Sequence, residues 1–110
     1  MNIVTFRCST NLAVAMTIQS RQKFRVKNRL GIHAAPAAMI AKILNKYQSI
    51  DVWVRNVEEQ VNGKSIMSLM MLEARRNTDL LFIVEGGTLS EHQNLLKEIA
   101  ALFDSKFYED

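Results

Sequence analysis

The sequence predicts an α+β domain in which helices cover one face of an antiparallel or mixed sheet. Three observations indicate this fold class. Strand-like and helix-like segments follow one another in the order β-α-β-β-α-β-α. The short segments are rich in β-branched and aromatic residues, and the longer ones repeat apolar residues at helical spacing. A chain of 110 residues with 48% hydrophobic content supports one domain with one modest core.

The first strand and the first helix are separated by a tight turn. Apolar and charged residues alternate over residues 22–27, which predicts a half-buried strand. Gly31 breaks this strand and supplies the turn. A helix is expected over residues 34–47, where apolar side chains recur at helical spacing. Pro36 fits this assignment because a proline is tolerated near a helix start, where its missing N–H would have no partner.

Two strands and a short helix are expected next. Residues 50–55 are typical of a strand, and a polar turn leads to a short third strand over residues 60–62. Ser65 is placed to cap a short helix over residues 66–72. Within that helix, Leu69 and Leu72 are expected to pack into the core.

The last third of the chain is expected to form a loop, a strand and a helix. In the loop over residues 73–79, Asn77 can take a left-handed conformation. Residues 80–84 predict the most buried strand, which a pair of glycines closes. The final helix is expected to begin near Ser90, because Ser90 and Gln93 fit a capping box.

Residues 1–20 are expected to be an appendage to a domain formed by residues 21–110. Their apolar run is too short to span a bilayer, and it makes a poor signal peptide. Two interpretations remain open for this segment: a flexible N-terminal extension, or a start codon assigned too early. No membrane insertion is expected.

Composition excludes several classes of function. The net charge of +3 is too small to indicate a nucleic-acid-binding protein. Trp53 and Phe82 lie in strands expected to form the core, which leaves no aromatic platform for stacking bases. The single Cys8 excludes an internal disulfide, and no Cys/His spacing resembles a zinc site. We therefore expect a cytoplasmic protein with no metal and no organic cofactor.

The most informative residue is His33, which is predicted to stand at the N-cap of the first helix. Unpaired backbone amides and the positive end of the helix dipole meet at that position. An imidazole there could carry a phosphoryl group, because helix N-termini bind phosphate well and a neutral imidazole is a nucleophile at cellular pH. The alternative interpretation is a histidine that simply caps a helix.

Two motifs resemble those of the HPr family, the histidine-containing phosphocarriers of the bacterial sugar phosphotransferase system. The stretch Gly31-Ile32-His33-Ala34-Ala35-Pro36-Ala37 resembles the active-site motif of that family, and Val61-Asn62-Gly63-Lys64-Ser65-Ile66-Met67 resembles its regulatory-serine motif. The resemblance covers about residues 22–104. It implies an open-faced sandwich in which three helices cover one face of a four-stranded antiparallel sheet.

The resemblance also implies a function. His33 would accept a phosphoryl group from phospho-enzyme I and pass it to the A domains of sugar permeases. The protein would then be a monomeric carrier with a phosphohistidine intermediate rather than a true catalyst. Ser65 would be phosphorylated by an HPr kinase/phosphorylase. The apolar side chains of Ile66, Met67 and Met70 would form the docking surface for partners.

Two departures from the family pattern weaken the case for transfer. Ala35 stands where the family normally has an arginine that contacts the phosphoryl group, and its loss could slow transfer on the order of tenfold to a thousandfold. Glu73 stands where small residues are usual. Arg29, Arg75 and Arg76 are candidates to replace the missing arginine. A second hypothesis follows: a regulatory HPr-like adaptor that responds to Ser65 phosphorylation and transfers phosphoryl groups weakly or not at all.

Overall fold

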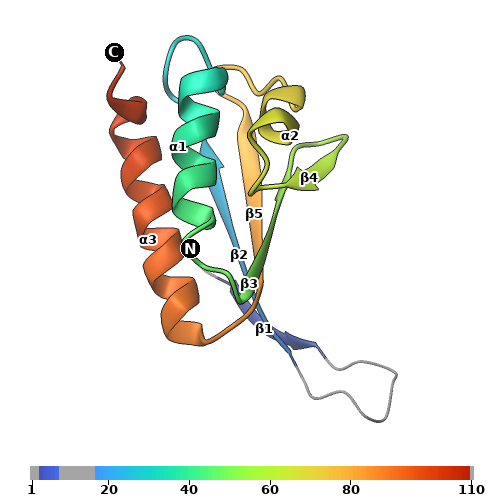
Figure 1. The fold of residues 1–110 in the computed structure, drawn as a ribbon. Helices are drawn as coiled ribbons and strands as arrows, with labels where there is room; N and C mark the ends of the chain where they lie inside the picture. Colours follow the sequence, from blue (N-terminus) through green and yellow to red (C-terminus); the bar gives the residue numbers. More distant parts are fainter. Residues whose placement is uncertain (1–2, 8–16, 110) are drawn as a thin grey trace.

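A twisted antiparallel sheet forms one layer of the molecule, and three helices form the other (Figure 1). The structure is a computed structural model that describes residues 3–7 and 17–109. Its strands are β1 (Ile3–Arg7), β2 (Thr17–Arg25), β3 (Ile50–Arg55), β4 (Gln60–Asn62) and β5 (Asp79–Gly86). Its helices are α1 (Ala34–Leu44), α2 (Ile66–Met71) and α3 (Leu89–Asp104), and a short 3₁₀ turn follows at Lys106–Tyr108.

The strand order in the sheet is β1-β2-β5-β3-β4, with every neighbouring pair antiparallel. The expected four-stranded sheet is confirmed as β2, β5, β3 and β4, and β1 adds a fifth strand beside β2. Thus the described parts of the predicted extension, residues 3–7 and 17–20, are strands. Its remaining residues, 1–2 and 8–16, lie outside the described residues, so the expectation of a flexible or wrongly assigned start remains a prediction.

The core lies between the helices and the covered face of the sheet. Side chains of β3 alternate strictly between buried and exposed, as the period of a strand requires. Four phenylalanines join the layers: the rings of Phe24 and Phe103 stack with centroids 5.1 Å apart, and Phe82 and Phe107 meet Phe103 edge to face. Such aromatic pairs add to the free energy of burial through their ring geometry.

One core expectation was wrong. Phe82 is fully buried, but Trp53 points to the open face of the sheet and is 36% exposed. The reason is the period of two along β3, which buries Val52 and Val54 against the helices and turns Trp53 the other way. Aromatic and β-branched composition indicated a strand at this position without indicating which face each residue would occupy.

Most element boundaries agree with the sequence, and the differences have local causes. The strands over residues 50–55 and 60–62 are confirmed, and Asn77 is left-handed with φ of 73°. The first strand runs over residues 17–25 instead of 22–27, and the last over 79–86 instead of 80–84. The first helix ends at Leu44 because the side chain of Asn45 bonds the C=O groups of Ala41 and Lys64.

The helix α3 begins at Leu89, close to the expected start, but its capping residues differ from those expected. Thr88, not Ser90, is the N-cap, and it forms a capping box with Glu91 rather than with Gln93. Gly87 has a left-handed backbone conformation that ends the turn after β5. Thr88, the next residue, is therefore the N-cap of the helix. Both S-x-x-Q and T-x-x-E patterns are present in the sequence, and the position of the glycine turn selects between them.

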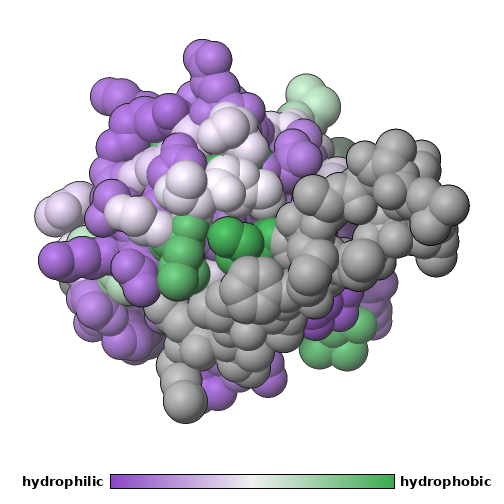
Figure 2. Space-filling model, turned by 90° about the horizontal axis from the view of Figure 1, so that it is seen from below, coloured by the Kyte–Doolittle hydropathy of each residue, from purple (hydrophilic) through white to green (hydrophobic). Residues whose placement is uncertain are grey.

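The surface and the helices show two further general features. Figure 2 views the molecule from below, the end where β5 finishes and α3 begins, and outside the grey area this surface is mostly hydrophilic or intermediate in hydropathy. None of the helices in the described part of the chain combines the length and the apolar character needed to cross a membrane.

Candidate functional site at the start of α1

The first turn of α1 lacks a side-chain cap. His33 is its N-cap in an extended conformation, as predicted, but the imidazole makes no capping hydrogen bond. The first intrahelical bond runs from the N–H of Ala37 to the C=O of His33, at 3.0 Å. The N–H groups of Ala34 and Ala35 come before this bond and have no acceptor within the helix, and Pro36 has no N–H. The helix therefore presents two backbone donors at the position where an anion is stabilised by the helix dipole.

Gly31 brings this turn against the loop that follows α2. Its φ is +70°, and a Cβ at this position would lie 2.3 Å from the carbonyl oxygen of Ala74. The neighbouring N–H of Ile32 donates to the same oxygen at 2.9 Å. The predicted glycine turn is therefore required both by its dihedral angle and by the close backbone approach. It sets the position of His33 relative to the 73–75 segment.

The imidazole of His33 is oriented by the C-terminus of the chain. Its Nε2 lies 2.5 Å from Oε2 of Glu109, and the His33 side chain remains 37% exposed. The other carboxylate oxygen of Glu109 accepts from Nδ2 of Asn28 at 2.9 Å, and the same Nδ2 donates to the carbonyl of Gly31 at 2.7 Å. Asn28 and Glu109 could not be identified from the sequence, because no local pattern connects residues 76 positions apart, as His33 and Glu109 are.

An unusual backbone turn places Glu109 beside His33. Lys106, Phe107 and Tyr108 all have left-handed φ values, of 54°, 55° and 58°. For a residue other than glycine, the left-handed conformation raises the conformational energy by about 1–2 kcal/mol. Burial of Phe107 against Phe103, with ring centroids 4.9 Å apart, offsets part of this cost. The turn reverses the chain after α3, so that Glu109 reaches the start of α1.

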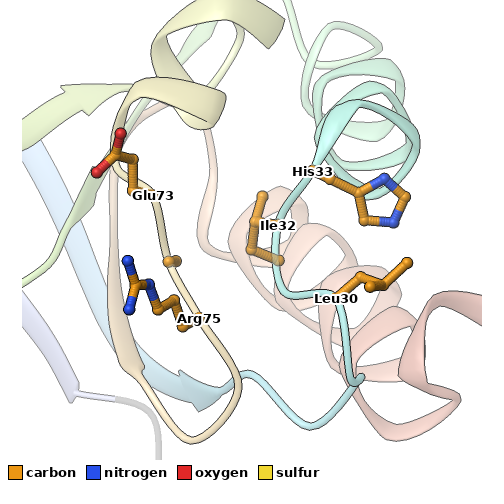
Figure 3. A pocket seen from close by; sticks show the side chains of 6 residues that line it. Leu30, Ile32, His33, Glu73 and Arg75 are labelled. Atoms are coloured by element: carbon orange, nitrogen blue, oxygen red, sulfur yellow. The ribbon is translucent and has the colours of Figure 1, made fainter.

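A hollow of about 290 Å³ lies beside the imidazole. Its lining residues come from the turn before α1 and from the loop after α2: Leu30, Ile32, His33, Glu73, Ala74 and Arg75. Figure 3 shows the side chains of Glu73 and Arg75 extending from their loop on the side away from the His33 ring. Of the three arginines suggested by the sequence, Arg75 thus lines the hollow, whereas Arg29 and Arg76 do not.

The second motif forms a separate feature on α2. Ser65 is the N-cap of α2, as predicted, and its hydroxyl accepts from the N–H of Ser68 at 3.2 Å. The amine of the adjacent Lys64 is used inside the fold, where it donates to the carbonyls of Tyr47 and Ile50 at 2.8 and 2.5 Å. Lys64 therefore fastens the start of α2 to the segment between α1 and β3.

The exposed face of α2 is apolar. We call Ile66, Met67, Met70 and Met71 the methionine patch; these residues are 41–72% exposed and line a groove of about 490 Å³. The sequence predicted the first three at a docking surface, and Met71 lines the same groove. Leu69 and Leu72 are buried in the core, as predicted. Glu73 lines both this groove and the hollow beside His33, so the two features adjoin.

The chain is similar in sequence and in fold to several known proteins. A family model described as the PTS HPr component phosphorylation site matches residues 20–105. The phosphocarrier protein HPr of Treponema pallidum is 38% identical over 86 residues, which is 78% of this chain and 93% of that protein. The HPr-like protein Crh of Bacillus subtilis is 35% identical over 81 residues, or 74% and 91% of the two chains. The crystal structure of HPr-C-His from Thermoanaerobacter tengcongensis has a TM-score of 0.71 and 30% identity, and the match covers 82% of this chain and 97% of that one.

Proposed function

This chain belongs to the HPr phosphocarrier family of the phosphotransferase system, and we propose that it accepts a phosphoryl group on His33 from phospho-enzyme I. It then passes this group to the A domains of sugar permeases. The protein acts as a monomer in the cytoplasm. The observation that carries the proposal is the partly exposed imidazole at the uncapped start of α1.

The transfer step fits the groups at this site. A ring nitrogen of His33 attacks the phosphorus of the phosphohistidine on enzyme I; the new P–N bond forms as the P–N bond of the donor breaks, and the donor imidazole leaves. Positioning and charge stabilisation dominate such reactions. The N–H groups of Ala34 and Ala35, which have no acceptor within the helix, supply donors for the phosphoryl oxygens without any side-chain movement. The reverse step then delivers the group to an acceptor.

The missing arginine is the main difficulty for this proposal. Ala35 is exposed in the first turn of α1 and offers the phosphoryl group no charge. Arg75 is the best candidate to replace the arginine, because it is exposed and lines the same hollow as His33. Its side chain must rotate toward the imidazole to reach a phosphoryl oxygen, since it extends the other way in Figure 3. A guanidinium can then bind two phosphoryl oxygens at once.

A labelling experiment tests the carrier function. The protein is incubated with enzyme I of the host and ³²P-labelled phosphoenolpyruvate, and acid-labile label on His33 is measured by mass spectrometry and autoradiography. We expect stoichiometric label on His33. Absence of label, with enzyme I shown to be active on another HPr, would rule out the carrier function with this donor.

A second candidate function is a regulatory adaptor controlled at Ser65. The methionine patch begins one residue after Ser65, so a phosphate on this hydroxyl would add a charge of about −1.5 to −2 at the edge of the patch. A partner that brings acidic groups close to Ser65 when it docks on the patch would then bind more weakly. In this function, an HPr kinase/phosphorylase of the host supplies and removes the phosphate.

The adaptor hypothesis is tested with a matched pair of substitutions. Ser65→Asp adds a charge and Ser65→Asn does not, while both residues remain good N-caps of α2. We expect Ser65→Asp to lower the affinity for enzyme I by about tenfold and Ser65→Asn to leave it near that of the wild type. If Ser65→Asp and Ser65→Asn bind enzyme I and the host permease A domains with the same affinity, the hypothesis of regulation at Ser65 is contradicted.

A further inference from the structure

We propose that Glu109, held in place by Asn28, is a positioning residue that fixes the orientation and tautomer of the His33 imidazole for phosphoryl transfer. The inference rests on the function proposed above. It assigns a role to the C-terminal turn, which lies beyond residues 20–105, the part of the chain that the family model matches.

The contact between His33 and Glu109 determines which ring nitrogen is free. An ionised carboxylate can only accept hydrogen bonds, so Nε2, 2.5 Å from Glu109, carries the proton. In a neutral imidazole the lone pair is then on Nδ1. Nδ1 is therefore the nucleophilic atom, and rotation of the ring is opposed by the bond at Nε2.

Asn28 in turn fixes the carboxylate. Its side chain is fully buried, and its Nδ2 donates both to Glu109 and to the carbonyl of Gly31. The buried Oδ1 of Asn28 has no partner among the described residues. The amide cannot reverse, because its oxygen would then face two other acceptors. The orientation that holds Glu109 is thus kept even though it leaves a buried acceptor unsatisfied.

The backbone gives an independent reason to assign a role to this turn. Three consecutive residues, Lys106, Phe107 and Tyr108, are left-handed without being glycine. Strain of this kind persists only where the surroundings over-determine the conformation, and it gathers at functional sites. Here the turn is held by the buried ring of Phe107 on one side and by the bonds of Glu109 on the other.

The charge change during transfer shows what the carboxylate contributes. When Nδ1 forms its bond to phosphorus, the ring gains a positive charge while Nε2 keeps its proton. The carboxylate of Glu109 lies next to that proton and stabilises the cation, much as a buried carboxylate does in other histidine-based sites. In a chain with Ala35, Glu109 thus adds charge stabilisation on the ring side of the new P–N bond.

The test compares Glu109→Ala and Glu109→Gln with Asp51→Asn, a control that removes one carboxylate from the open face of the sheet. Two quantities are measured: the Nε2–H proton signal of His33 in ¹H–¹⁵N spectra, and the initial rate and apparent KM for labelling by phospho-enzyme I. Urea unfolding shows that each variant is folded.

We expect a slowly exchanging Nε2–H signal for His33 in the wild type and in Asp51→Asn. Glu109→Ala should lose this signal and be labelled about 10- to 100-fold more slowly at saturating phospho-enzyme I, with an unchanged KM. Glu109→Gln keeps one acceptor oxygen but no charge, so its labelling rate should lie between those of the wild type and Glu109→Ala.

Several outcomes would overturn the inference: an Nε2–H signal that persists in Glu109→Ala, a labelling rate equal to that of the wild type, or faster labelling. Faster labelling would mean that Glu109 obstructs the imidazole instead of orienting it. Failure of the proposed function is distinguishable, because the wild type and Asp51→Asn would then both remain unlabelled while the Nε2–H signal could still be compared.

Discussion

The two histidines of this protein lie at opposite ends of the fold and have opposite environments. His33 stands at the start of α1, partly exposed, with one ring nitrogen bonded to Glu109. His92, in the first turn of α3, is fully buried, with both nitrogens bonded: Nδ1 to the hydroxyl of Ser20 at 2.7 Å, and Nε2 to the carbonyl of Gly86 at 2.6 Å. In Figure 1, α1 begins at the upper end of the molecule and α3 begins at the lower end.

The two ends of the fold also differ in helix capping, in hydrogen-bond satisfaction and in backbone strain. At the His92 end, a complete capping box closes α3. At the His33 end, α1 has no side-chain cap and the Oδ1 of Asn28 has no partner among the described residues. The non-glycine residues Glu73, Lys106, Phe107 and Tyr108 have left-handed backbone conformations there. Satisfied polar groups stabilise a fold, whereas unsatisfied and strained ones mark places where function takes precedence. The comparison supports the proposal that His33 is the site of chemistry, and it places His92 in the framework of the fold.

The largest effect is expected from His33→Ala. This substitution should abolish acid-labile labelling by phospho-enzyme I, because no other group at the start of α1 is a nucleophile. The free energy of unfolding should change by less than about 1 kcal/mol, since the side chain is partly exposed. Urea unfolding and labelling of the same sample measure both quantities. Residual acid-labile label would mean that a different residue carries the phosphoryl group.

His92→Ala should show the reverse pattern. The change leaves a buried cavity and removes the partners of Ser20 and Gly86, so the free energy of unfolding should fall by about 3 kcal/mol. The labelling rate of the folded protein should stay near that of the wild type. Thermal and urea unfolding measure the first quantity. If His92→Ala lowers the labelling rate of fully folded protein, the two ends are coupled and the comparison fails.

Ala35→Arg sharpens the description of the His33 end. The side chain at this position is exposed, so an arginine should fit without disturbing the core. It would supply the charge that the family motif normally has, and the labelling rate should rise at least about tenfold. Ala35→Gln serves as a control of similar length without charge. If Arg75 already serves this purpose, Ala35→Arg will have little effect and Arg75→Gln will slow labelling.

The smallest effect is expected from Thr88→Ala at the His92 end. Loss of the capping box of α3 should lower the free energy of unfolding by about 1 kcal/mol. Ser90→Ala is the matched control, and it should have almost no effect, because Ser90 is not the cap. A larger loss in Ser90→Ala than in Thr88→Ala would contradict the observed start of the helix.

Local features of this protein were largely predictable from the sequence. The sequence predicted two strands, two N-cap positions, one left-handed residue and one glycine turn, and all are present. They are the strands over residues 50–55 and 60–62, the N-cap positions of His33 and Ser65, Asn77 and the turn at Gly31. Each depends on residue types within a few positions, where backbone dihedral angles and side-chain periodicity decide the outcome. The wrongly predicted cap of α3 shows the limit of such patterns, since two possible capping boxes begin within two residues of each other.

What the sequence alone determined is the order of the elements, the fold class and the position of His33 at a helix start. The tertiary structure alone decided that Glu109 and Asn28 hold its imidazole, that Arg75 lines its hollow, that Trp53 faces outward, and that His92 is buried against Ser20. These contacts join residues tens of positions apart. Their partners are selected when the helices pack on the sheet and apolar surface is buried, a process that no local pattern of residues records.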